Sequence, residues 1–374
     1  MKIGFDARLI SSLGIGRYIS GLLPPLAEML RDRLVVIGAG SDVALLRALT
    51  HGQARLIVSN AAPYRSAEQS ALLLQLLKAR LSLVHFPHYN FPIAYPGRFV
   101  VTIHDLFSFQ FPEIHSGPLP RALNRTLIAN AVRRAAAIIT PSRATAAEVA
   151  DRFPSARARL TAIAEAADDR FSAARNLVAE AAWQRYLEIR PPYFLYLGQW
   201  KPYKNVLLLI EAFAQVIRER PDLQLVIAGH DPRHPEIPAA AASLPAGRVV
   251  LPGRLPEDAV PDLYRSAAAV VVPSRAEGFG LPVLEAMACG VPVVCSDLAV
   301  LKELADSVAI FCDPSSASSF AAGMLAALDS SEDARVQRGI ARAGTYSWKA
   351  AADETVTIYE RALAGRPSSL SDTN

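Results

Sequence analysis

Short apolar runs alternate with amphipathic helical patterns along almost the whole chain, and this alternation restarts after a Pro-Pro pair. In the first half, apolar runs typical of buried strands lie at residues 3–5, 34–37, 83–86, 99–103 and 136–140. Three- and four-residue apolar spacing predicts helices between them, at residues 18–30, 67–81 and 119–134. The second half repeats the order, with strands at residues 193–197, 223–228, 248–251, 269–272 and 291–295 and helices at residues 206–218 and 258–266. Alternating strands and helices build parallel sheets, so an α/β fold of two doubly wound units is predicted.

The length of the chain agrees with two domains. Its 374 residues exceed one ordinary core and suit two domains of roughly 150 to 200 residues. The pair Pro191-Pro192 cannot continue a helix, so we expect domains at residues 1–190 and 191–345. A last amphipathic helix is expected at residues 346–366, followed by a frayed Ser- and Pro-rich tail at residues 367–374.

Composition excludes several classes of protein. Apolar residues make up 51% of the chain and charged residues 20%, which indicates a globular fold. No apolar run reaches the roughly 18 residues that a transmembrane helix needs, and the N-terminus has no signal-peptide pattern, so a cytoplasmic location is expected. Cys289, Cys295 and Cys312 lack the spacing of a zinc site or a disulfide framework, and we expect buried thiols.

Positive charge is concentrated in the first half of the chain. Residues 1–190 contain 23 Lys and Arg against 14 Asp and Glu, whereas residues 191–374 contain 16 against 21. A basic N-terminal half would attract a phosphate-bearing acceptor or an anionic membrane surface, and an Arg-rich solvated surface is the alternative. A nucleic-acid partner is not expected, because the basic residues are not interleaved with aromatic ones.

The segment Glu277-Gly-Phe-Gly-Leu-Pro-Val-Leu-Glu285 places two carboxylates around a glycine-rich turn. Gly278 and Gly280 allow backbone N–H groups to come close to a ligand, and a helix is predicted to begin at Leu281. Such a turn suits a diphosphate. One carboxylate precedes the turn and the other lies in the helix, so one could face a sugar and the other a ribose.

Further polar residues follow predicted strands, where open parallel sheets bind their ligands, and the active site is therefore expected between the domains. Gly14 and Gly16 open a helix after the first strand, with an ordinary tight turn as the alternative. His104 directly follows the fourth strand. Lys201 and Lys204 precede a helix N-terminus, where cations need an anionic partner, and exposed loop lysines are the alternative.

Two other loops of the second half have weaker signals. Residues 229–234 contain two histidines, but their spacing is unspecific and no metal is expected. Residues 252–256 follow a predicted strand and could place backbone groups against a base.

Taken together, these motifs resemble the retaining glycosyltransferases of family 4. The most specific part is the E-x7-E motif from Glu277 to Glu285, followed by Ala286-Met-Ala-Cys-Gly-Val-Pro-Val-Val294. Other matching segments are Gly14-Ile-Gly-Arg17, His104-Asp105, Thr140-Pro-Ser-Arg143, Lys204-Asn205, Gly253-Arg-Leu255, Pro273-Ser-Arg-Ala-Glu-Gly-Phe-Gly280 and Tyr346-Ser-Trp348. The resemblance implies the GT-B fold, in which two Rossmann-like domains face each other across a cleft and the C-terminal helix crosses back to the N-terminal domain. A terminal helix packed on its own domain is the alternative.

The resemblance also implies roles for individual residues. Glu277 is expected to contact the donor sugar, Lys204 to neutralise the departing diphosphate, and His104 to approach the sugar near the reacting centre. Glu285 is expected to bind the nucleotide ribose. The other implied nucleotide-sugar-binding residues are Gly14, Gly16, Gln199, Lys201, Arg254, Leu255, Gly278, Phe279, Gly280 and Leu281.

Two positions depart from the family pattern. Gln199 and Tyr203 stand where the family often has arginine, and Lys201 is expected to supply the missing charge. The implied reaction needs no metal or other cofactor, because lysines and backbone N–H groups stabilise the diphosphate and its oxygen takes the acceptor proton. Neither glutamate is assigned an acid or base role.

The segments His85-Phe-Pro-His-Tyr-Asn90 and Asp6-Ala-Arg8 resemble polysaccharide and lipopolysaccharide mannosyltransferases, which implies GDP-mannose as the donor. UDP-glucose or another UDP-sugar is the alternative. The expected acceptor is a glycan or a polyprenyl- or lipid-linked sugar at the anionic inner membrane surface. It would bind the basic N-terminal domain, whose arginines on or near one helix are Arg121, Arg125, Arg133 and Arg134. A nucleotide-sugar 2-epimerase, a phosphorylase and a non-catalytic GT-B binding protein are the other functions considered.

Overall fold

A computed structural model describes residues 1–65, 67–114, 117–329 and 333–365 and divides the chain into two compact units. The N-terminal unit contains residues 1–166 together with the segment from Ser347 onward, and the C-terminal unit contains residues 167–346. Each unit is built on one parallel sheet, of seven strands in the first and six in the second. The predicted α/β fold of two doubly wound units is confirmed.

The seven strands of the N-terminal unit lie in the order β3-β2-β1-β4-β5-β6-β7. They are β1 (Ile3–Asp6), β2 (Leu34–Gly38), β3 (Arg55–Val58), β4 (Leu83–Phe86), β5 (Phe99–Thr102), β6 (Ala137–Thr140) and β7 (Leu160–Ala162). The inner strands are buried on both faces, which is why they are almost continuously apolar in sequence. In register, Phe5 lies opposite Val36 on one side and His85 on the other. The strand order reverses between β1 and β4, which creates a topological switch point at their carboxyl ends.

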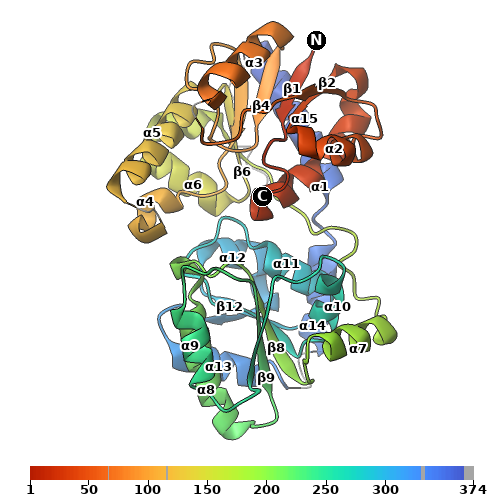
Figure 1. Ribbon diagram of the computed structural model, residues 1–374, viewed down its shortest axis with the longest axis vertical. Helices are drawn as coiled ribbons and strands as arrows, with labels where there is room; N and C mark the ends of the chain where they lie inside the picture. The colour runs from red at the N-terminus through yellow and green to blue at the C-terminus, as the bar shows by residue number, and fades with distance from the viewer. Residues whose placement is uncertain (66, 115–116, 330–332, 366–374) are drawn as a thin grey trace. The chain divides into compact units, whose positions relative to one another are not determined.

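Helices cover both faces of this sheet (Figure 1). On one face pack α1 (Leu13–Leu30), α2 (Val43–Leu49) and α15 (Trp348–Ala364). On the other face lie α3 (Leu73–Ala79), α4 (Phe107–Gln110), α5 (Pro118–Arg134) and α6 (Arg143–Arg152). The short turns are η1 (Arg31–Arg33), η2 (Gly40–Asp42), the π-helical η3 (Glu68–Leu72), η4 (Pro112–Ile114) and η5 (Pro154–Arg159).

Helix α15 belongs to the N-terminal unit although it follows the C-terminal unit in sequence. Its Tyr359 hydroxyl lies 2.7 Å from Nδ1 of the buried His85 in β4. The Trp348 indole fills the space beside Gly21, where a Cβ atom would lie 2.1 Å from the ring. Arg98 donates to the last carbonyl groups of the helix at 2.8 and 2.6 Å. The predicted return of the C-terminal helix to the N-terminal domain is therefore confirmed.

The six strands of the C-terminal unit lie in the order β10-β9-β8-β11-β12-β13, and this order reverses between β8 and β11. They are β8 (Tyr193–Leu197), β9 (Gln224–Ala228), β10 (Val249–Gly253), β11 (Ala269–Val272), β12 (Val293–Ser296) and β13 (Ile310–Cys312). One face carries α8 (Val206–Glu219), α9 (Glu236–Ala242) and α13 (Ala317–Ala326) (Figure 1). The other layer contains α7 (Leu177–Tyr186), α10 (Ala259–Ser266), α11 (Leu281–Ala288), α12 (Ala299–Ala305) and α14 (Asp333–Ala343). The turns are η6 (Pro202–Lys204) and η7 (Asp306–Val308).

The boundary between the units lies at residues 166/167, whereas the sequence predicts it at residues 190/191. Helix α7 explains the difference, because it precedes the Pro-Pro pair and yet packs on α10. Its buried Glu180 accepts a hydrogen bond from Arg175 Nε at 3.1 Å and lies 3.8 Å from Arg265 Nε of α10. Pro191-Pro192 therefore leads into β8 within the C-terminal unit. The predicted frayed tail, residues 367–374, lies outside the described residues.

Candidate active site

A lysine and a glutamate from two different loops meet at the switch point of the C-terminal unit. Lys204 ends η6, which follows β8, and Glu277 lies in the loop after the neighbouring strand β11. Lys204 Nζ is 2.7 and 2.9 Å from the two carboxylate oxygens of Glu277. Ser274 Oγ donates to the same carboxylate at 2.6 Å. The two side chains are 19% and 8% exposed, so the ion pair is shielded but still reaches the surface.

Gly280 gives the turn after Glu277 its shape. Its φ of +106° lies in the region that favours glycine, and an added Cβ would lie 2.6 Å from Leu301 Cδ2. The turn leads into α11, which begins at Leu281. The first N–H groups of this helix and the positive end of its dipole therefore lie at the carboxyl end of β11. A glycine turn that opens a helix is the arrangement predicted for diphosphate binding.

The other residues of this turn differ in how much of them is exposed. Phe279 is buried, and its ring meets Tyr346 edge-on with 6.1 Å between the ring centres. Gly278 and Leu281 are half-buried. Because the Phe279 side chain belongs to the core, only its backbone is available to a ligand.

The second glutamate of the motif, Glu285, lies inside α11 and is only 2% exposed. Tyr264 of α10, itself fully buried, donates its hydroxyl to Glu285 Oε2 at 2.9 Å. The core thus fixes the orientation of this carboxylate. The two glutamates have different surroundings, since Glu277 pairs with a lysine near the surface and Glu285 is held by a buried phenol.

Gln199 and Lys201 lie in the loop after β8. The backbone carbonyl of Gln199 accepts a hydrogen bond from the Tyr196 hydroxyl at 2.8 Å. Lys201 Nζ is 4.0 Å from Asp231 Oδ2, in the loop after β9, and Arg233 binds the same carboxylate at 2.9 and 2.7 Å. Burial and the neighbouring Arg233 lower the pKa of Lys201. Asp231 therefore balances part of the positive charge of Lys201, which the sequence interpretation pairs with a diphosphate.

The remaining predicted nucleotide-sugar-binding residues lie in two other loops. Arg254 is exposed and Leu255 is buried, directly after β10. Gly14 and Gly16 lie in the first turn of α1 in the N-terminal unit. An added Cβ at Gly16 would lie 2.2 Å from the Ile10 carbonyl oxygen, whereas Gly14 has open space around it. Gly16 is thus required by close backbone packing.

His104 follows β5 in the N-terminal unit, and both of its ring nitrogens have partners. Nδ1 is 3.2 Å from Glu165 Oε1, and Nε2 donates to the Pro87 carbonyl at 2.9 Å. Both partners are acceptors, so the geometry suits an imidazolium that donates from both nitrogens. Burial lowers the pKa of His104, but the bonds to Glu165 and Pro87 outweigh this effect and raise the pKa above its usual value.

Three partners of the site were not found from the sequence. Ser274 stands three residues before Glu277, and this short spacing is a signal that could have identified it. Tyr264 and Glu165 are 21 and 61 residues from their partners, so no local pattern connects them.

The described residues contain neither a candidate metal site nor a candidate membrane span. Within the described ranges, no three His, Cys, Asp or Glu side chains are grouped as a metal site requires. Across the same residues, none of the helices combines the length and the apolar character needed to cross a bilayer.

Comparison with known families agrees with this arrangement. Residues 14–171 match the family model Glycosyltransferase Family 4, and residues 180–343 match the model Glycosyl transferases group 1. The chain is a glycosyltransferase. The first match covers the N-terminal sheet except β1, and the second covers the whole C-terminal sheet with Lys204, Glu277 and Glu285.

Curated relatives of this glycosyltransferase include enzymes with different names. O-antigen chain mannosyltransferase B from Escherichia coli is 29% identical over 283 residues, 74% of each chain. D-inositol 3-phosphate glycosyltransferase from Segniliparus rotundus is 34% identical over 179 residues, which are 46% of this chain and 40% of the relative. The chain thus spans most of the mannosyltransferase and less than half of the second relative.

Solved structures share the fold of this glycosyltransferase. Sucrose-phosphate synthase from Thermosynechococcus elongatus superposes with a TM-score of 0.78 and 19% identity, covering 97% of this chain and 99% of the other. The Anabaena protein HepE, in complex with UDP-glucose, gives 0.77 and 18%, covering 96% and 99%. WaaG, a glycosyltransferase involved in lipopolysaccharide biosynthesis, gives 0.70 and 15%, covering 95% and 99%. The GT-B fold is confirmed.

Proposed function

We propose that this glycosyltransferase transfers a hexose from a nucleotide diphosphate sugar to a glycan or a polyprenyl- or lipid-linked acceptor, in the assembly of surface polysaccharide or lipopolysaccharide. The Lys204–Glu277 pair beside the start of α11 carries the proposal. It lies where the strand order of the C-terminal sheet reverses, and open α/β sheets bind phosphorylated ligands at such a position.

In the proposed reaction, the bond between C1 of the sugar and the diphosphate oxygen breaks. The acceptor hydroxyl forms its bond to C1 on the same face, so the configuration is retained, and its proton passes to the departing diphosphate oxygen. Lys204 and the first N–H groups of α11 stabilise the negative charge that develops on the diphosphate, with Lys201 nearby. These groups act without a metal ion or another cofactor.

The ion pair between Lys204 and Glu277 is compatible with this role. An ammonium group has three N–H donors and a carboxylate has about four acceptor positions. Lys204 and Glu277 can therefore keep one mutual bond while Lys204 binds a phosphate oxygen and Glu277 binds sugar hydroxyls. In this proposal Glu285 binds the ribose, and its bond from Tyr264 holds it in place.

In this proposal, His104 contacts the donor sugar after one of its two hydrogen bonds opens. Both of its nitrogens are already bonded, so contact with a sugar hydroxyl requires that one bond opens. The bond to the Pro87 carbonyl is the one to open, because the bond to Glu165 joins opposite charges and is stronger.

The proposed donor is GDP-mannose. The similarity to the O-antigen mannosyltransferase supports this donor, since the matched region covers 74% of each chain. A UDP-sugar is the alternative, because the related HepE structure contains UDP-glucose. The test is a thermal-shift panel of GDP-mannose, UDP-glucose, UDP-galactose and UDP-N-acetylglucosamine, followed by mass spectrometry of the products.

GDP-mannose is expected to raise the Tm most and to be hydrolysed slowly to GDP and mannose. A larger shift with a UDP-sugar would replace the proposed donor. Epimerisation of a UDP-sugar without any acceptor would show the 2-epimerase reaction instead of transfer.

Contact with the cytoplasmic face of an anionic membrane is the second part of the proposal. Leu119 and Leu123, four residues apart on α5, are 79% and 55% exposed. Desolvation, together with the nearby charges of Arg121 and Arg152, lowers the pKa of Arg125. Exposed leucines beside concentrated positive charge suit a helix that lies on an anionic bilayer.

Flotation with vesicles tests this contact. The protein is expected to float with phosphatidylglycerol-containing vesicles at low salt and less with neutral phosphatidylcholine vesicles. The double variant Leu119→Ser/Leu123→Ser is expected to stay at the bottom of the gradient. Leu74→Ser is the matched control, because Leu74 is 56% exposed on α3. Wild-type protein that never floats with the anionic vesicles would contradict the membrane contact.

A further inference from the structure

The N-terminal unit has its own switch point, at the carboxyl ends of β1 and β4. Residues that follow three strands gather there: Arg8 after β1, Tyr64 after β3, and His88 to Asn90 after β4. None of these residues belongs to the donor-binding set described above. By the same rule that places the donor at β8 and β11, this edge of the sheet is where a second ligand binds.

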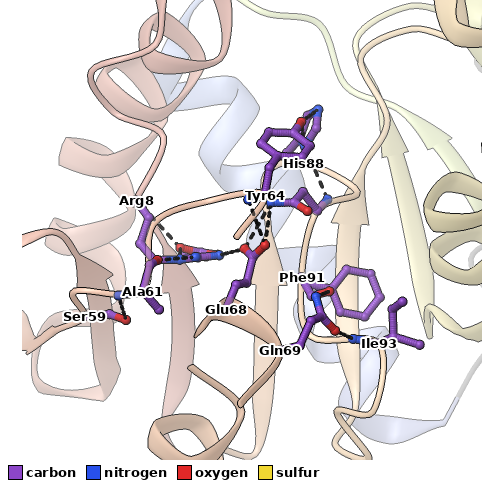
Figure 2. A network of polar contacts seen from close by, with 11 residues as sticks. Arg8, Ser59, Ala61, Tyr64, Glu68, Gln69, His88, Phe91 and Ile93 are labelled. Carbon is purple, nitrogen blue, oxygen red and sulfur yellow. Dashed lines mark hydrogen bonds and ion pairs between the residues drawn. The ribbon is translucent and has the colours of Figure 1, made fainter. Parts of the chain in front are cut away.

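A buried polar network supports this edge. Arg8 pairs with Asp6, with Nε–Oδ1 at 2.9 Å and Nη2–Oδ2 at 2.8 Å. Its Nη2 is also 2.7 Å from Glu68 Oε1, and its Nη1 donates to the Ala61 carbonyl at 3.0 Å. Figure 2 shows the Glu68 carboxylate reached by Arg8, with Tyr64 and His88 close by. The three charged side chains of this network are at most 7% exposed.

The charges of this network do not favour an anion. One guanidinium lies between the two carboxylates of Asp6 and Glu68, so the formal charge of the three groups is −1. The Asn90 amide donates to both oxygens of Glu68 at 3.0 and 2.9 Å, and the Tyr64 N–H donates to Oε2 at 3.0 Å. Arg8 is thereby committed to protein carboxylates, and a phosphate placed above them would be repelled.

Three aromatic side chains lie on this network. The ring centres of His88 and Tyr89 are 3.8 Å apart. The Tyr64 ring meets the His88 ring edge-on, with 5.9 Å between the ring centres. Tyr64 is 52% exposed, and its hydroxyl is 3.4 Å from His88 Nε2. The Asn90 N–H donates to His88 Nδ1 at 3.2 Å, so the ring proton is on Nε2. The cluster therefore offers a half-exposed ring together with hydroxyl and imidazole groups.

These side chains are neutral across the physiological range. Burial lowers the pKa of His88 to about 3, so its imidazole is uncharged. Burial raises the pKa of Tyr89 to about 12, and burial together with the neighbouring Tyr89 raises the pKa of Tyr64 as well. The ligand that suits this surface is uncharged, has an apolar face for a ring to pack on, and has hydroxyl groups.

We infer that Tyr64, His88 and Tyr89 bind a neutral sugar of the acceptor glycan. A pyranose has a C–H face that packs on an aromatic ring, and its hydroxyls bond to the phenol and imidazole groups. The phosphate of a lipid-linked acceptor does not bind here, because of the carboxylates beneath. This inference rests on the proposed function and refines it, since it assigns a sugar rather than a phosphate to the switch point of β1 and β4.

The test measures binding of simple sugars to the full chain by saturation-transfer NMR. The probes are methyl α-mannoside and methyl α-glucoside, with mannose 6-phosphate as the anionic comparison. Tyr64→Ala is expected to weaken binding of the preferred methyl glycoside by about tenfold, which corresponds to roughly 1.4 kcal/mol. Tyr64→Phe keeps the ring and is expected to lose about threefold. Tyr186→Ala is the matched control, because Tyr186 is 73% exposed in the C-terminal unit.

Three results would overturn the inference: no saturation transfer from wild-type protein to either methyl glycoside, equal binding by Tyr64→Ala, or tighter binding of mannose 6-phosphate than of the neutral glycosides. A GDP and UDP thermal shift on the same samples separates this inference from the proposed function. Nucleotide binding without Tyr64-dependent sugar binding removes the inference alone. Tyr64-dependent sugar binding without nucleotide binding removes the proposed donor chemistry and leaves the sugar site.

Discussion

The two switch points of the molecule share one topology and differ in how their cations are held. In the C-terminal unit, Lys204 faces one carboxylate, is 19% exposed and lies beside a helix N-terminus. In the N-terminal unit, the Arg8 side chain is 2% exposed and lies between Asp6 and Glu68. A cation that is buried and fully paired cannot turn to a ligand without leaving a buried carboxylate unpaired. The depth and the partners of the cation, rather than the topology of the sheet, therefore separate the proposed diphosphate site from the proposed site for a neutral sugar.

The largest expected effect is on stability and concerns Arg8. Arg8→Met leaves two buried carboxylates without their cation and is expected to destabilise the N-terminal unit by about 3–5 kcal/mol. Calorimetric melting measures the loss. Arg157→Met is the control, because Arg157 is 66% exposed, lies 3.8 Å from Asp151 and is expected to contribute less than about 1 kcal/mol. Equal melting of the two variants would show that the Arg8 network is not a structural support.

The next effect is on catalysis and concerns Lys204. Lys204→Ala removes the charge nearest to the proposed leaving group and is expected to lower kcat by about 10² to 10³. Its melting temperature is expected to fall less than that of Arg8→Met, because one carboxylate instead of two loses its cation and Lys204 itself is 19% exposed. Lys302→Ala serves as control, since Lys302 forms an exposed pair with Asp297 at 2.6 Å. Undiminished turnover by Lys204→Ala would show that another group neutralises the diphosphate.

Acid is expected to unfold the N-terminal unit first. Burial lowers the pKa of His85 from 6.5 to about 3, so the folded state resists protonation that the unfolded chain accepts. His85 therefore contributes stability above pH 6.5 that is lost as the pH falls toward 3, at up to about 1.4 kcal/mol per pH unit. His88 acts in the same direction. His104 acts in the opposite one, because its raised pKa gives stability at low pH that is lost as the pH rises.

Calorimetry from pH 7.5 to 4.5 measures this sensitivity. His85→Gln is expected to be less stable at pH 7.5, because it disturbs the bonds to Tyr359 and Thr102, and to lose less stability on acidification. His51→Gln, at an exposed turn, is the control. An unchanged pH dependence in His85→Gln would mean that other groups control the acid transition.

The smallest expected effect concerns Tyr264. Tyr264→Phe removes the bond to Glu285 Oε2 and is expected to weaken nucleotide binding by roughly tenfold, or about 1.4 kcal/mol. Isothermal titration with GDP and UDP measures the change. Tyr193→Phe is a suitable comparison, because Tyr193 is equally buried but bonds the Leu263 carbonyl and Ser266 instead of a motif residue. Equal nucleotide affinity in the two variants would contradict the proposed role of Glu285 in binding the ribose.

The sequence predicts the central strands well and the edge strands poorly. Strands β3, β7 and β13 were not identified, because they are short and only partly buried, so they lack a continuous apolar run. The expected helix at residues 67–81 is divided into the π-helical turn η3 and α3. The predicted boundary between the units differs from the observed one for a related reason. Helix α7 belongs to the C-terminal unit because it packs on α10, and these two helices are far apart in sequence.

In the candidate site, too, the sequence predicts features that are local in the chain and misses contacts between distant residues. Glu277, Gly280 and Glu285 are close in sequence, and their spacing alone indicates a turn that opens a helix. The bond between Lys204 and Glu277 spans 73 residues, and the bond between His104 and Glu165 spans 61. Such pairs form only because parallel strands bring their carboxyl ends to one edge of a sheet.

By itself, the sequence determined the alternation of strands and helices, the two-unit α/β fold and the glycine turn of the E-x7-E motif, because each depends on residues that are neighbours along the chain. Only the tertiary structure decided which cation is free to act. Lys204 and Arg8 both follow the first strand of a parallel sheet unit, and no local pattern separates them. Burial depth and the number of facing carboxylates separate them, and both depend on residues brought together by folding.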